Sequence, residues 1–197
     1  MALGLVRSQQ KAGALAQAEC GFRKILEAAP QYRDALVLMG QIEASRHVAV
    51  RMDFAEAFEF HRRGDLAKAE QIYRALLTSD PRHFYAIHLL GVIFLQRDQF
   101  AAAEQQVSRA ILINPDFADA HNNLGAALNS LGRFGEALTS FNRASLLRPD
   151  YPEAANNRGN ALKGLGRPDE ALASYDKAIA LKAKLSRCDE KSGQSVS

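Results

Sequence analysis

The sequence predicts an all-α solenoid, a fold in which antiparallel helix pairs stack along the chain. Three series of residues recur with a spacing of 34: Pro81, Pro115 and Pro149; Gly91, Gly125 and Gly159; Ala103, Ala137 and Ala171. A fixed period of this length is typical of stacked two-helix units, because one unit alone cannot bury its apolar face. The chain is rich in alanine and leucine, lacks tryptophan and has only six prolines, which favours helices that approach closely.

The unit over 118–151 shows the pattern most clearly. Its first helix carries apolar or small residues on one face, including Leu124, Gly125 and Leu128. Gly132 ends that helix, because glycine readily adopts the backbone conformation of a helix C-terminus. A second helix follows with Phe134, Ala137, Leu138, Phe141, Ala144 and Leu147 on its apolar face. Pro149 ends it, since proline lacks the amide hydrogen and disfavours helix in the preceding residue.

The same register divides the chain into three parts. Four tandem units are predicted over 50–83, 84–117, 118–151 and 152–185. Residues 1–49 are predicted to form an irregular N-terminal region of one repeat plus a lone helix. Residues 186–197 lose the pattern and are polar, which predicts a flexible tail.

One stretch departs from the regular order. Pro30 and Pro81 are 51 positions apart, which amounts to one and a half repeats, so two first-type helices are predicted to adjoin over 33–63. These helices either fuse into one long helix or bend near 45–47. The irregular order would expose apolar residues, and we hypothesise that a second copy of the chain covers them as a homodimer.

The repeated pattern resembles the tetratricopeptide repeat. The residues that carry the resemblance are His121, Leu124-Gly125, Leu128, Ala137, Phe141 and Pro149. The next unit departs from it, with Arg158-Gly159 in place of leucine–glycine and Ala183 in place of the final proline. The resemblance implies a right-handed superhelix whose first helices line a concave groove, and a function in binding other proteins.

First-helix residues that the core pattern does not use are predicted to face this groove. Its early part is aromatic and basic, and its later part is rich in asparagine. The candidate peptide-binding residues are Phe58, His61, Tyr85, His88, Leu89, Asn122, Asn123, Asn129, Asn156, Asn157, Asn160 and Lys163.

The pair Asn122-Asn123 recurs one repeat later as Asn156-Asn157. An asparagine amide offers both a donor and an acceptor, as a peptide bond does, so a series of them can hold an extended peptide by its backbone. The array is similar to the tetratricopeptide superhelix of O-linked N-acetylglucosamine transferases, and the resemblance implies that Asn123 and Asn157 are the peptide-binding asparagines. The alternative is that asparagine is merely a tolerated polar residue on these helices. A groove that clamps a C-terminal carboxylate is excluded, because Glu153 has the wrong charge.

The residues point to no enzyme. No phosphate-binding glycine loop, zinc motif, paired cysteines or serine elbow is present, so no catalytic residue, metal or cofactor is predicted. The 25 basic and 22 acidic residues are too balanced to favour nucleic acid, although a basic series (Arg51, Arg62, Arg63, Arg74 and Arg82) keeps RNA binding as a weaker alternative. No apolar run reaches the roughly 18 residues that a membrane span needs.

The two cysteines, Cys20 and Cys188, lie far apart in the sequence, which favours a reduced, cytoplasmic location. The leading functional hypothesis is therefore a non-catalytic scaffold that binds a protein or peptide in its concave groove. The alternative is the substrate-recognition arm of a larger glycosyltransferase whose catalytic domain is not in this sequence.

Overall fold

The computed structural model describes residues 54–193, with side chains described as far as residue 186. The chain divides into two compact units, Met1–Ile72 and Tyr73–Ser197. The predicted N-terminal region over 1–49, and most of the irregular stretch over 33–63, lie outside the described residues. Every regular element of the described chain is a helix: a first helix over 54–62 is followed by α3 (Leu66–Ser79), α4 (Phe84–Gln96), α5 (Phe100–Ile113), α6 (Ala118–Ser130), α7 (Phe134–Leu147), α8 (Pro152–Gly164) and α9 (Pro168–Gly193).

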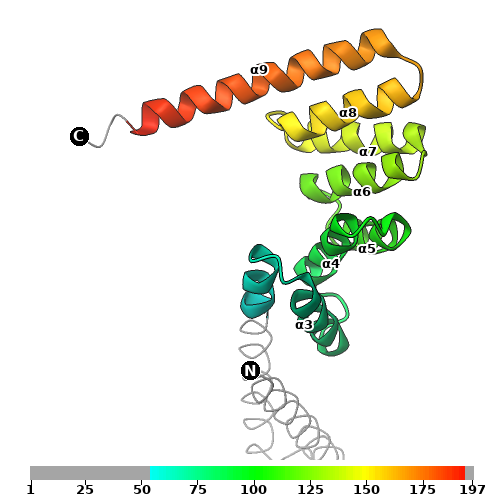
Figure 1. Cartoon of the computed structure of the whole chain (residues 1–197), viewed down its shortest axis with the longest axis vertical. Coiled ribbons are helices and arrows are strands. Elements are labelled where there is room, and N and C mark those ends of the chain that lie inside the picture. The colour runs from blue at the N-terminus through cyan, green and yellow to red at the C-terminus, as the bar shows by residue number, and fades with distance from the viewer. Residues whose placement is uncertain (1–53, 194–197) are drawn as a thin grey trace, which may run out of the picture. The chain divides into compact units, whose positions relative to one another are not determined.

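The helices of the second unit pack in pairs, and the pairs stack in chain order. The closest contacts join α4 with α5, α6 with α7, and α8 with α9, while α5 packs on α6 and α7 on α8. Figure 1 shows α6, α7 and α8 lying side by side in this order. The first helices also touch one another, α4 with α6 and α6 with α8, whereas α5 and α7 make no comparable contact. The first helices therefore lie on the inner side of the stack, and the predicted all-α solenoid is confirmed.

A residue with positive φ stands between the two helices of each pair. Gly132 and Gly166 adopt φ values of 75° and 70°, and Asp98 takes the same place with φ 57°. This left-handed residue lets the next amide bond back to the helix that has just ended, as Arg133 N does to the Leu128 carbonyl at 2.9 Å. The tight turn returns the chain along the first helix, and so creates the pair.

The two helices of a pair approach most closely where a glycine of the first helix packs against a large side chain of the second. A Cβ atom added at Gly125 would lie 2.6 Å from the Phe141 ring, and one at Gly159 would lie 2.4 Å from the Tyr175 ring. Phe141 is only 1% exposed and packs with Leu128, Ala137 and Ala161 in a buried cluster. The recurrent glycine is therefore required by the closeness of the two helices, which a larger residue would force apart.

The last helix is longer than the sequence predicts. α9 continues to Gly193, so residues 186–193 of the predicted flexible tail are helical. The helices α5 and α7 end at Ile113 and Leu147, just before Pro115 and Pro149, but the corresponding position in α9 is Ala183. Alanine has the highest helix propensity and leaves the backbone hydrogen bonds intact, so the helix does not end there. Figure 1 shows α9 reaching past the end of α8.

Two glycine-to-alanine variants test the close approach of the helices. We expect Gly125→Ala to lower the free energy of unfolding by about 1–3 kcal/mol, because the buried Phe141 ring cannot yield without strain. The matched control is Gly135→Ala on α7, where an added Cβ meets nothing within 4 Å. That variant should leave stability unchanged or raise it by up to about 1 kcal/mol, since alanine favours a helix. Urea unfolding followed by circular dichroism measures both, and equal effects would contradict the packing argument.

Candidate peptide-binding surface

We define the inner surface as the predicted binding residues of α4, α6 and α8, the helices on the inner side of the stack. Their exposure differs, however. Tyr85 is 53% exposed, and Asn156, Asn160 and Lys163 are also exposed, whereas His88 and Asn122 are buried, at 6% and 7%. The other four are half-buried: Leu89, Asn123, Asn129 and Asn157.

Phe58 and His61 belong to the first unit. Both lie on the helix over 54–62, where Phe58 is 46% exposed and His61 is half-buried.

Asparagine side chains link neighbouring first helices. The Nδ2 atom of Asn157 on α8 donates to Oδ1 of Asn122 on α6, at 3.1 Å. One repeat earlier, Nδ2 of Asn123 lies 3.1 Å from Nε2 of His88 on α4. Burial lowers the pKa of His88, with Asp119 acting in the opposite direction, so the neutral ring can accept this hydrogen bond. Among the described residues, neither amide oxygen of Asn123 or Asn157 has a protein partner, and both remain available to a ligand.

An aromatic cluster, defined as Phe84, Tyr85, His88 and Phe117, lies at the α4 end of this surface. The rings of Phe84 and Phe117 meet edge to face with centroids 5.1 Å apart, and His88 meets Phe117 similarly at 5.2 Å. Tyr85 also meets Phe84 edge to face, at 5.0 Å. Such contacts hold the rings in fixed orientations, so the exposed Tyr85 ring is presented on a rigid base.

A polar network that the sequence analysis missed stabilises the junction of α6 and α8. Asp119 on α6 accepts two hydrogen bonds from Arg148, at 2.8 and 2.9 Å, and a third from the Tyr151 hydroxyl at 2.7 Å. The Arg148 guanidinium also lies over the Tyr151 ring, 4.4 Å from its centroid. Arg148 and Tyr151 are 29 and 32 positions from Asp119 in the chain, and no local pattern indicates that they contact it.

The network controls the charge of Asp119. Burial raises the pKa of this carboxyl group, but the hydrogen bonds from Arg148 and Tyr151 and the nearby positive charge outweigh it, so the pKa lies below its ordinary value. The pKa of the Tyr151 hydroxyl is raised, first by burial and then by its hydrogen bond to Asp119. Asp119 therefore stays ionised at neutral pH and holds the start of α8 against α6.

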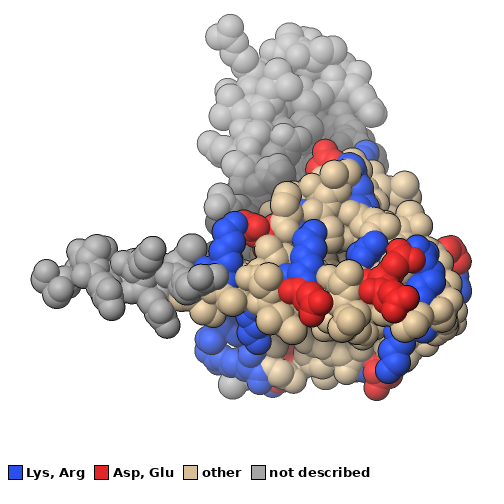
Figure 2. All heavy atoms as spheres, turned by 90° about the horizontal axis from the view of Figure 1, so that it is seen from above, with Lys and Arg blue, Asp and Glu red and all other residues tan. Residues whose placement is uncertain are grey.

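Many acidic and basic side chains lie next to one another on the surface of the described residues. Figure 2 shows Lys and Arg next to Asp and Glu over the face that it presents. Many are paired, as Arg133 is with Glu104 and Glu136, each at 2.6 Å. Within residues 54–193, no group of three His, Cys, Asp or Glu side chains could hold a metal ion, and none of the helices is long and apolar enough to cross a bilayer.

Family models match both halves of the solenoid. Two tetratricopeptide repeat models cover residues 60–128 and 116–184. The chain belongs to the tetratricopeptide repeat family. This membership supports a role as a protein–protein interaction scaffold, the use to which stacked helix pairs with a concave surface are commonly put. No curated protein sequence matches the chain significantly.

Solved structures share this tetratricopeptide repeat fold. The crystal structure of MamA aligns with a TM-score of 0.60 at 23% identity, covering 91% of this chain and 95% of MamA. A double mutant of MamA from RS-1 aligns with a TM-score of 0.65 at 18% identity, over 85% of this chain and 96% of that one. A mutant O-GlcNAc transferase from Thermobaculum terrenum is 31% identical with a TM-score of 0.55, but the match covers 57% of this chain and only 22% of the transferase.

The Asp119 network predicts a specific dependence of stability on pH. Because the folded-state pKa of Asp119 is depressed, its contribution to stability is complete above the unfolded-state pKa of about 3.9 and is lost as the pH falls through the folded-state value. We expect Asp119→Asn to lower stability at pH 7 and to reduce the further loss below pH 4. Thermal unfolding between pH 2 and pH 7 measures this difference.

Asp116→Asn is the control for this prediction. The Asp116 side chain is 70% exposed and accepts one hydrogen bond, from Arg143 at 2.8 Å. Exposed pairs of this kind contribute little to stability, roughly 0–1 kcal/mol. Equal losses in the two variants at pH 7 would show that the Asp119 network contributes no more than an ordinary surface ion pair.

Proposed function

We propose that this chain is a non-catalytic scaffold that binds an extended peptide segment of a partner protein along the inner surface of α4, α6 and α8. The observation that supports the proposal most directly is the pair of half-buried amides at Asn123 and Asn157. Each belongs to a first helix, the two helices are in contact, and each amide is oriented by a bond to the preceding first helix. The surface thus repeats the same polar group at the period of the solenoid.

The chemistry of these amides suits a peptide backbone better than a particular side chain. Each Asn Nδ2 uses one hydrogen in the bond between repeats, which leaves its second hydrogen and the oxygen for a ligand. A backbone N–H group can donate to this oxygen, and a backbone carbonyl can accept from the remaining hydrogen. The exposed Tyr85, Asn156, Asn160 and Lys163 are then positioned to select among peptide side chains.

A peptide held in this way binds at a lower entropic cost than it would on a flexible surface. The His88 and Asn122 side chains are buried and already bonded, so Asn123 and Asn157 need little further ordering when a ligand binds. We infer that His88 and Asn122 hold the amides of Asn123 and Asn157 in place, and that these two amides contact the peptide.

We also propose a second candidate, a substrate-recognition arm that holds acceptor segments for a glycosyltransferase. It rests on the 31% identity to part of the Thermobaculum terrenum O-GlcNAc transferase. The two candidates differ in selectivity. A scaffold for one partner should bind one family of related sequences on a peptide array, whereas an acceptor arm that grips the backbone should bind many unrelated serine- and threonine-containing peptides with similar affinity.

The double variant Asn123→Ala with Asn157→Ala tests peptide binding. Peptides selected on an array with the unaltered chain should bind the variant about tenfold or more weakly, because each lost amide removes hydrogen bonds worth about 0.5–1.5 kcal/mol. Fluorescence anisotropy of labelled peptides measures the affinity, and mass spectrometry of proteins captured from a lysate identifies natural partners that carry the selected sequence.

A matched control separates contact from stability. Gln105 and Thr139 also occupy equivalent positions of successive repeats, and they are exposed on the second helices α5 and α7. Their double alanine variant should bind the peptides as the unaltered chain does, and circular dichroism should show both variants fully helical. The proposal fails if the asparagine variant is folded and binds every selected peptide with unchanged affinity.

A further inference from the structure

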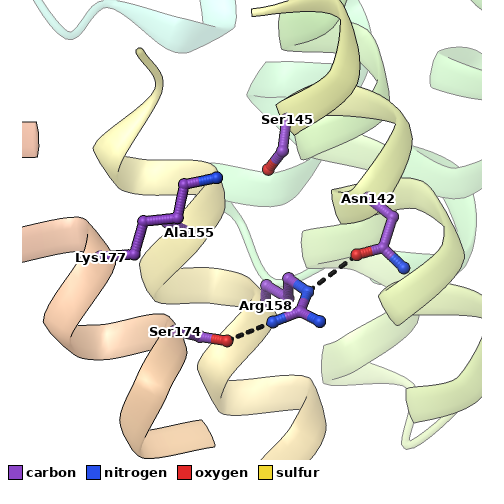
Figure 3. Close-up of a pocket in the computed structure, with 6 residues that line it drawn as sticks. All are labelled: Asn142, Ser145, Ala155, Arg158, Ser174 and Lys177. Atoms are coloured by element: carbon purple, nitrogen blue, oxygen red, sulfur yellow. Dashed lines mark hydrogen bonds between the residues drawn. The ribbon is translucent and has the colours of Figure 1, made fainter. Parts of the chain in front are cut away.

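A pocket of about 340 Å³ lies where α7, α8 and α9 meet. Its lining contains two cations and no acid: Asn142 and Ser145 from α7, Ala155 and Arg158 from α8, and Ser174 and Lys177 from α9. Figure 3 shows the Arg158 guanidinium between Asn142 and Ser174, while the Lys177 side chain extends toward the Ser145 side of the pocket. Ala155 and Arg158 lie on a different face of α8 from Asn156, Asn160 and Lys163, so this pocket is separate from the inner surface.

An arginine in the pocket lining replaces a leucine of the repeat. Arg158 occupies the repeat position that Leu90 and Leu124 hold in the two preceding units, and Leu90 is buried in the core of its own pair. A guanidinium cannot fill such a position without hydrogen bonds. Its Nε donates to Oδ1 of Asn142 at 2.8 Å, and one Nη donates to the Ser174 hydroxyl. These bonds fix the plane of the guanidinium, while the other Nη group has no protein partner among the described residues.

Lys177 supplies a second positive charge. One repeat earlier Arg143 stands in its place and pairs with Asp116 at 2.8 Å. The counterpart of Asp116 is Asp150, but it accepts from Lys184 at 3.1 Å, a residue that the extension of α9 brings into place. Within the described chain, Lys177 therefore forms no ion pair, and its charge is available to a ligand.

Glu170, an acid that interacts electrostatically with Arg158, already has hydrogen-bond partners. Glu170 interacts with Arg158 through space, but its two oxygens accept hydrogen bonds from Arg167 at 2.6 and 2.7 Å. Its backbone carbonyl accepts from Ser174, which helps to position the Ser174 hydroxyl beside Arg158. The positive charge of the pocket is thus not neutralised by a carboxylate in its lining.

We propose that this pocket binds a phosphoryl group, supplied either by free phosphate or by a phosphorylated side chain of a partner protein. A phosphoryl group carries a charge of about −1.5 to −2 and three acceptor oxygens, which match one guanidinium, one ammonium group and the Ser145 hydroxyl. The fixed guanidinium plane favours bidentate recognition, since little side-chain freedom remains to be lost on binding. The site does not depend on the proposed peptide surface, because α8 uses a different face for each.

The test is a titration of the full chain with inorganic phosphate at constant ionic strength. Nuclear magnetic resonance follows the Nε–H signal of Arg158, and we expect a saturable shift. A second arm compares a phosphoserine peptide with the same peptide carrying serine or glutamate. Binding of free phosphate alone assigns the site to the free ion, and tighter binding of the phosphopeptide assigns it to a phosphorylated partner. Glutamate and phosphoserine peptides binding equally would overturn the assignment to a phosphoryl group.

Three variants locate the site. Arg158→Leu restores the leucine of the other repeats, and Lys177→Gln changes an exposed residue without burying anything. Each should weaken phosphate binding by about tenfold or more, the loss expected of one charge-assisted interaction. Lys182→Gln removes an exposed charge of α9 outside the pocket lining and should leave the affinity within about twofold. Unchanged binding in Arg158→Leu and Lys177→Gln, or no saturable shift in the unaltered chain, would overturn the proposal; if Arg158→Leu does not fold, Lys177→Gln decides.

Discussion

The packing of one glycine against one large side chain determines how closely the two helices of a pair approach. Gly91, Gly125 and Gly159 lie directly over Val107, Phe141 and Tyr175, the side chains at the equivalent position of each second helix. This closeness lets a 13-residue first helix and a 14-residue second helix bury a common apolar strip, as α6 and α7 do. The pair then exposes a second apolar face, which the next pair covers. The regular spacing of the first helices, and hence of any ligand groups they carry, follows from this contact.

Polar contacts between repeats add position-specific detail to this regular frame. The Asn157–Asn122 bond and the Asp119–Arg148–Tyr151 network join α8 and its preceding loop to α6. In contrast with the apolar contacts, they differ from one repeat to the next, because the residue equivalent to Asp119 is Tyr85 in one repeat and Glu153 in another. The repeats therefore share a backbone arrangement but present different chemistry, which is the property that a selective binding surface requires.

The two proposed sites use the repeat in different ways. The inner surface uses positions that the core does not need, so asparagine there costs little stability and can be oriented by its neighbours. The pocket at α7, α8 and α9 uses a core position, where Arg158 stands in place of leucine and must be supported by Asn142 and Ser174. A scaffold of identical units can tolerate one such change, because each unit contacts only its neighbours.

The sequence by itself determined the helix pairs and their period, because proline, glycine and the apolar spacing act on the local backbone. It also indicated that Asn123 and Asn157 share one face, since they occupy equivalent positions of successive repeats. The extent of α9 was predicted wrongly, although the absence of proline at Ala183 was the signal for it. Only the tertiary structure decided which side chains meet: Asn157 with Asn122 across 35 residues, and Arg158 with Ser174 across 16. These contacts depend on the distance and angle between packed helices, which no local sequence pattern specifies.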